Sequence, residues 1–149
     1  MKRFKFKLQP LLNYRQYLER LAQQNTARAH MDVGLCEKQI AHLKQTYDQN
    51  AEKIEMIVTK GVSAFKFRQY HQYLDSVGTG IEDEKSRKID LQRILQKKLL
   101  ELKKKSVDKK AMELYREKLK AKYDQEVIKN EQKELDEISS LKTARIRSK

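Results

Sequence analysis

The chain has 149 residues, of which 37% are charged and 7% are aromatic, and it carries a net charge of +13. With no Trp, four Gly and one Pro, this composition argues against a typical compact core and favours long helices that bury a thin apolar stripe. Disorder is the competing interpretation for so polar a chain, but the sustained apolar repeat described next argues against it.

A long helix over about residues 10–59 is the first predicted helix. The segment before it alternates Phe4, Phe6 and Leu8 with lysines, and we expect an extended lead-in because a lone strand has nothing to pair with. Pro10 favours a helix start, where its missing N–H costs nothing. Apolar positions then recur about every 3.5 residues, the period of a left-handed coiled coil. We call this stripe the seam, and its predicted members are Leu11, Tyr14, Leu18, Ala22, Thr26, Ala29, Val33, Cys36, Ile40, Leu43, Tyr47, Asn50, Ile54 and Ile57.

Three consecutive steps of four residues near Ala22 predict a locally relaxed supercoil. The single cysteine, Cys36, cannot form an internal disulfide and is expected to be a small buried residue of the seam. A helix of this length cannot cover its own stripe, so a second helix must bury it.

A turn at residues 60–63 leads to that second helix, predicted over about residues 64–142. Gly61 fits a left-handed position after the first helix, and Ser63 can cap the next one. A break at Gly78 and Gly80 is the alternative to a continuous helix, but the unbroken seam on both sides favours continuity. The predicted seam comprises Phe67, Tyr70, Leu74, Val77, Ile81, Glu84, Lys88, Leu91, Leu95, Lys98 and Leu102.

The basic run at residues 103–110 interrupts this predicted seam. A looser apolar stripe then resumes through Met112, Tyr115, Leu119, Tyr123, Val127, Leu135 and Ile138, and residues 143–149 are expected to fray.

These elements predict an all-α fold, a long antiparallel two-helix coiled coil that forms one domain over residues 1–149. Folding back at the turn places Leu43 near Thr79, and everything past about residue 113 overhangs the start of the first helix. Residues 31–90 have a net charge of −1, which leaves about +14 for the two ends of the chain. We therefore expect an elongated, charge-polarised hairpin that is a monomer in isolation.

The sequence offers no constellation typical of a catalytic, cofactor-binding or metal-binding site. His30, His42 and His71 do not have the spacing of a ligand pair, no Gly-rich phosphate loop is present, and a two-helix rod has no enclosed pocket. We predict a non-enzyme without cofactor or metal. The lysine run raises nucleic-acid binding as an alternative, but no aromatic residues are interleaved for stacking, so we predict no nucleic-acid partner. Neither a secretory signal nor a run of about 18 apolar residues is present, which indicates a cytoplasmic protein.

Two stretches at opposite ends of the chain carry a family resemblance. The first is F-K-F-K-L-Q-P-L-L-N-Y-R at residues 4–15, and the second comprises M-E-L-Y-R-E-K at 112–118 and E-Q-K-E-L-D-E-I at 131–138. Together they resemble the flagellar export family FliJ, and the turn with Gly61 and Ser63 is similar as well. Pro10 and the Gly78/Gly80 pair are not assumed to belong to the family pattern.

The resemblance implies a non-enzymatic stalk of the bacterial flagellar type III protein export apparatus, shaped like the central stalk of rotary ATPases. Its implied partners are the flagellar export ATPase hexamer, the export gate membrane protein and export chaperones. Its implied location is the cytoplasm, peripherally at the inner-membrane export apparatus. The equivalent stalk of a virulence type III secretion system is the alternative, and a basic nucleic-acid-binding coiled coil is a third interpretation.

The charge at the chain ends predicts that this end meets the ATPase ring, because complementary charge orients an encounter. The contact residues expected there are Phe4, Phe6, Leu8, Leu11, Leu12, Arg15, Tyr115, Leu119, Tyr123, Leu135 and Ile138. Near the turn we expect a gate contact through Leu43, Tyr47, Tyr70, Tyr73, Leu74 and Val77. Tyr73 falls outside the seam, so it should face solvent, as interface anchors do.

Overall fold

The computed structural model describes residues 2–148 and contains two long helices, α1 (Gln9–Lys60) and α2 (Ala64–Arg147). The helices pack against each other as a hairpin, and no strand occurs within the described residues, so the predicted all-α hairpin is confirmed. The chain folds into two compact units. Unit 1 comprises Met1–Glu19 and Lys104–Lys149, and unit 2 comprises Arg20–Lys103.

The loop that joins α1 to α2 owes its shape to two small residues. Gly61 has a φ of 96°, in the left-handed region that a Cβ disfavours, and its N–H donates to the Val58 carbonyl at 3.1 Å. The Ser63 hydroxyl accepts the N–H of Lys66 at 3.3 Å and so caps the first turn of α2. The loop therefore lies where the sequence predicts the turn.

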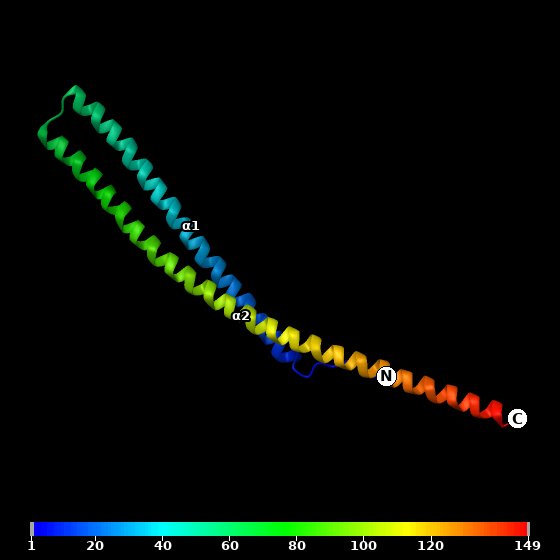
Figure 1. Ribbon diagram of the computed structural model, residues 1–149. Helices are drawn as coiled ribbons and strands as arrows, with labels where there is room; N and C mark the ends of the chain where they lie inside the picture. The colour runs from blue at the N-terminus through cyan, green and yellow to red at the C-terminus, as the bar shows by residue number, and fades with distance from the viewer. Residues whose placement is uncertain (1, 149) are drawn as a thin grey trace. The chain divides into compact units, whose positions relative to one another are not determined.

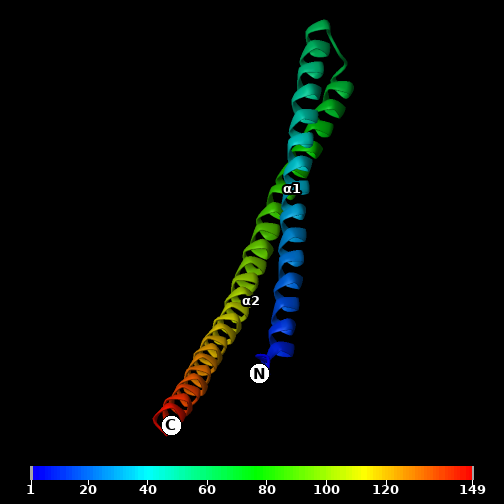
Figure 2. The same cartoon turned by 90° about the vertical axis from the view of Figure 1, so that its right-hand side faces the viewer.

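In unit 2 the two helices run antiparallel and side by side (Figures 1 and 2). Thr26 Oγ1 donates to the Lys98 carbonyl at 3.2 Å, and the Cys36 thiol donates to the Glu84 carbonyl at 3.4 Å, so the residue order along α1 is reversed on α2. Cys36 is 3% exposed, as predicted. The buried core of this unit is the predicted seam, with Ala29, Val33, Cys36, Ile40 and Ile54 on α1 and Leu74 and Ile81 on α2.

Helix α2 is continuous through Gly78 and Gly80, so the alternative of a break is wrong. A Cβ placed on Gly78 would lie 3.9 Å from Tyr47 Cε2, and one on Gly80 would lie 4.0 Å from Leu43 Cδ1. Leu43 thus lies against Gly80, the residue next to its predicted neighbour Thr79. Packing against the large side chains of α1 offsets the low helix propensity of glycine.

At the start of α1 the buried side of the helix differs from the prediction. Leu11 and Tyr14 are 39% and 57% exposed, whereas Leu12 is 2% exposed, Glu19 is buried and Arg15 is half-buried. The predicted local relaxation of the supercoil near Ala22 is therefore wrong, because the charged residues Arg15 and Glu19 occupy seam positions. With them included, the buried and half-buried positions alternate in steps of three and four at residues 12, 15, 19, 22, 26, 29, 33, 36, 40, 43, 47, 50 and 54.

The predicted loss of the seam on α2 after Leu102 is also wrong. Lys105 and Lys109 are half-buried at the seam positions between Leu102 and Met112, so the alternation of three and four continues through the lysine run. A lysine can occupy such a position because its alkyl stem packs along apolar surface while its amine reaches a polar partner. Helix α2 also runs beyond the predicted end near residue 142, to Arg147.

Candidate partner-binding site

The extended segment before α1 packs onto α2 within unit 1. Phe6 is 9% exposed and forms a core cluster with Leu12 and Met112, against which Phe4 and Leu119 pack. Two helices alone would leave this part of α2 partly uncovered. The N-terminal segment therefore covers the part of the apolar stripe on α2 that α1 leaves open.

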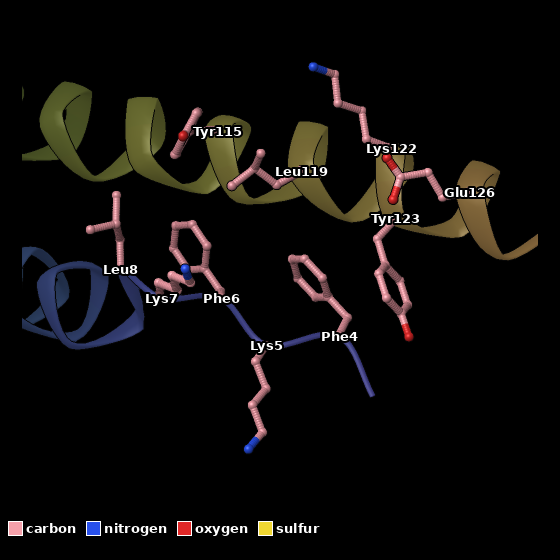
Figure 3. A pocket seen from close by; sticks show the side chains of 10 residues that line it. All are labelled: Phe4, Lys5, Phe6, Lys7, Leu8, Tyr115, Leu119, Lys122, Tyr123 and Glu126. Atoms are coloured by element: carbon pink, nitrogen blue, oxygen red, sulfur yellow. The ribbon is translucent and has the colours of Figure 1, made fainter. Parts of the chain in front are cut away.

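Two aromatic pairs fasten the segment to α2 (Figure 3). The ring centroids of Phe4 and Tyr123 lie 5.6 Å apart, and those of Phe6 and Tyr115 lie 6.1 Å apart in an edge-on arrangement. Such a pair contributes about 0.5–1.5 kcal/mol beyond its buried area. The Tyr123 hydroxyl also donates to the backbone carbonyl of Lys2. The period-2 alternation of the segment explains the arrangement, since both Phe rings point toward α2 while Lys5 points away from it.

An open groove of about 590 Å³ lies between the segment and α2, and we call it the aromatic groove. It brings together six of the residues predicted to contact the ATPase ring: Phe4, Phe6, Leu8, Tyr115, Leu119 and Tyr123. Leu8 and Tyr115 are 40% and 47% exposed, so they offer apolar surface to a partner even though their neighbours partly cover them.

Four charged residues that the prediction omitted also line the groove: Lys5, Lys7, Lys122 and Glu126. The alternation of Phe with Lys could have placed Lys5 and Lys7 beside the aromatic rings, whereas nothing in the sequence pairs the segment with Lys122. Unit 1 as a whole holds 19 basic and 10 acidic side chains, a net charge of +9. The groove is therefore an apolar site with a basic rim.

A polar cluster fixes the register of α1 against α2 in unit 1. Arg15 Nη1 donates to the Asp108 carbonyl at 2.8 Å, and Lys109 Nζ donates to Glu19 Oε1 at 3.0 Å and lies 3.9 Å from Glu113 Oε1. The hydrogen bond to Glu19 raises the pKa of Lys109. A shift of one helix along the other would separate these partly buried charges from their partners, which is costly.

The remaining residues of the predicted ring contact fall into two groups. Leu12 is enclosed in the core and Arg15 is hydrogen-bonded to the Asp108 carbonyl of α2, so neither of them lines the groove. Leu11, Leu135 and Ile138 are 39%, 62% and 51% exposed and lie outside the groove.

The residues predicted to contact the gate lie in unit 2, and their exposure separates one from the rest. Tyr73 is 48% exposed, so it faces solvent as expected. The other five are buried or half-buried: Leu43, Tyr47, Tyr70, Leu74 and Val77.

Residues 2–148 contain no cluster of three or more His, Cys, Asp or Glu that could hold a metal ion. Within the same range, neither helix has a stretch long and apolar enough to cross a membrane.

Comparison with known sequences agrees with the resemblance of the two end motifs. The sequence profile of the family described as "FliJ: Flagellar FliJ protein" matches residues 4–148, nearly the whole chain. No curated protein and no solved structure matches the chain.

Proposed function

Because the chain belongs to the flagellar FliJ family, a family of type III protein export, we propose that it is a non-catalytic stalk that joins the export ATPase ring to the export gate. The single observation that carries this proposal is the family match over residues 4–148. The match is to a flagellar family, which favours the flagellar system over the virulence alternative.

Unit 1 is the part that we assign to the ATPase ring. Its aromatic groove offers Leu8 and Tyr115 as exposed apolar surface, and its net charge is +9. A ring opening lined by carboxylates would attract and orient such a surface, since complementary charge speeds encounter and fixes register. Both end motifs that carry the family resemblance belong to this unit.

Unit 2 is the part that we assign to the gate. Tyr73 supports this assignment, because it is an exposed aromatic beside the buried Leu74 of the seam. Export chaperones are further proposed partners, and the proposed location is the cytoplasm, peripherally at the inner-membrane export apparatus.

A pull-down with the purified export ATPase, in monomeric and hexameric forms, tests the assignment of unit 1. The test variant reverses three charges at the groove, Lys5→Glu, Lys7→Glu and Lys122→Glu. It should bind the hexamer at least about tenfold more weakly, with a larger difference at low salt than at high salt. The matched control reverses three exposed lysines of unit 2: Lys44→Glu, Lys53→Glu and Lys60→Glu.

The control should bind the hexamer like the wild type. If the control weakened binding as much as the groove variant, net charge rather than the groove would govern the interaction. If only the control weakened binding, the ring contact would belong to unit 2.

A further inference from the structure

Helix α2 carries a second apolar line that the fold does not use. Val107, Leu114, Ile128 and Leu135 are 59%, 52%, 63% and 62% exposed, and Ala121 between them is exposed as well. The five residues follow one another at intervals of seven and all belong to unit 1. We call them the outer ridge.

The outer ridge lies on the side of α2 opposite its seam. Leu114 comes two residues after the buried Met112 and five after the half-buried Lys109, which places it at the heptad position farthest from the seam. That position is normally polar, because it faces solvent in a two-helix pair. A line of large apolar residues at this position marks an interaction surface.

We propose that the occupant of the outer ridge is the outer ridge of a second copy of this chain, lying antiparallel. The charges beside the ridge carry this choice. The residues that follow the ridge residues by three are Lys110, Glu117, Asp124 and Glu131, so this flank is basic at one end and acidic toward the other. In an antiparallel pair related by a two-fold axis, the same flank of each helix faces its counterpart with the direction reversed. The basic end of one copy therefore meets the acidic part of the other.

The charges also select the register of the pair. With Leu114 against its own equivalent in the second copy, Lys110 faces Glu117, and the two-fold axis gives this attraction twice. Sliding one helix by a heptad, so that Leu114 faces Ala121, would instead set Glu117 against its own equivalent on one flank and Lys118 against its own equivalent on the other. In the proposed register no two like charges face each other on either flank of the ridge. The charges of the pair are thus complementary along the ridge.

A ridge with one apolar residue per heptad predicts a weak dimer. Such a contact buries less surface than the roughly 1,200 Å² or more that stable specific interfaces bury. We therefore expect monomers in dilute solution and dimers as concentration rises.

Sedimentation velocity of the full chain from about 5 to 500 μM tests the proposal. At 0.15 M salt the screening length is about 8 Å, so contacts at the ridge count while distant charges do not. Leu114→Gln should raise the dimer dissociation constant about tenfold or more, because a buried leucine contributes roughly that much. Leu141→Gln is the matched control, since Leu141 is 65% exposed but lies off the ridge, and it should leave the constant unchanged.

Charge variants test the antiparallel register itself. Glu117→Lys should weaken the dimer, and the double variant Lys110→Glu with Glu117→Lys should restore it, because the swap re-forms both pairs. Glu117→Gln should weaken the dimer less than Glu117→Lys, because it removes the attraction without adding a repulsion. A monomer at every concentration would overturn the proposal, as would a dimer that is insensitive to Leu114→Gln or is not restored by the charge swap. The measurement uses this chain alone, so its outcome is independent of binding to the ATPase.

Discussion

Leu11 and Leu12 provide a matched pair for testing the seam at the start of α1. The two leucines are adjacent in sequence, but Leu12 is 2% exposed, between Phe6 and Met112, and Leu11 is 39% exposed. Leu12→Ala removes buried carbons and leaves a cavity, which costs about 2–5 kcal/mol in compact cores. Because the core of a helix pair is thin and can partly collapse, we expect about 2–3 kcal/mol. Leu11→Ala should cost less than about 1 kcal/mol, since its side chain already meets water.

Hydrogen exchange followed by mass spectrometry on peptides covering residues 9–19 measures this difference locally. Each 1.4 kcal/mol corresponds to a tenfold change, so Leu12→Ala should reduce protection roughly 30-fold to 150-fold and Leu11→Ala less than about fivefold. Far-UV circular dichroism should show the same helix content in both variants. Equal losses, or a larger loss for Leu11→Ala, would mean that the seam runs through Leu11 and Tyr14 instead.

Three further predictions concern single residues. Gly78→Ala should raise the free energy of unfolding by about 0.5–1 kcal/mol in urea titrations, because alanine has the higher helix propensity and its Cβ would meet Tyr47 at an ordinary van der Waals distance of 3.9 Å. Gly61→Ala should lower the free energy of unfolding, because the φ of 96° at this position disfavours a Cβ. Burial, followed by the hydrogen bond and charge of a neighbouring glutamate, raises the pKa of the Cys36 thiol, so folded protein at pH 8 should react far more slowly with a disulfide reagent than urea-unfolded protein; equal rates would contradict the buried seam. The hydrogen bond to Glu19 raises the pKa of Lys109, so the stabilisation from this pair is fully present below the ordinary lysine pKa of 10.5 and is lost as pH rises through the folded pKa. The difference in unfolding midpoint between wild type and Lys109→Met should therefore shrink from pH 7 to pH 11. A difference that stays constant over this range would refute the prediction.

The middle of the hairpin could be predicted from the sequence because one signal dominates there. Between Thr26 and Ile54 the apolar residues follow a single heptad repeat, and every predicted seam residue of α1 in that interval is buried or half-buried. The turn was equally readable, since Gly61 supplies the left-handed backbone and Ser63 the cap.

The ends of the hairpin could not be predicted in the same way, because charged residues hold the seam there. Arg15 and Glu19 occupy half-buried and buried seam positions because they bond to groups on α2. Leu11 and Tyr14 continue the apolar pattern in the sequence, but both side chains are exposed to solvent. An apolar pattern cannot report a position filled by an ion pair. Lys109 was misread for the same reason, as part of a solvated lysine run.

The candidate site was only partly predictable for a related reason. Periodicity places Phe4 and Phe6 on one side of the N-terminal segment and Tyr115 and Tyr123 on one stripe of α2. It does not say how far the extended segment reaches along α2, and the rim residue Lys122 depends on that reach.

Photo-crosslinking to the hexameric export ATPase tests the central claim most directly. A photoreactive phenylalanine analogue replaces Leu8, which is 40% exposed at the aromatic groove, or Tyr73, which is 48% exposed in unit 2. The proposed stalk function predicts a crosslink to the ATPase from position 8 and none from position 73. A crosslink from position 73 alone would place the ring contact on unit 2, and the absence of a crosslink from either position would contradict the assignment of this chain to the ATPase ring.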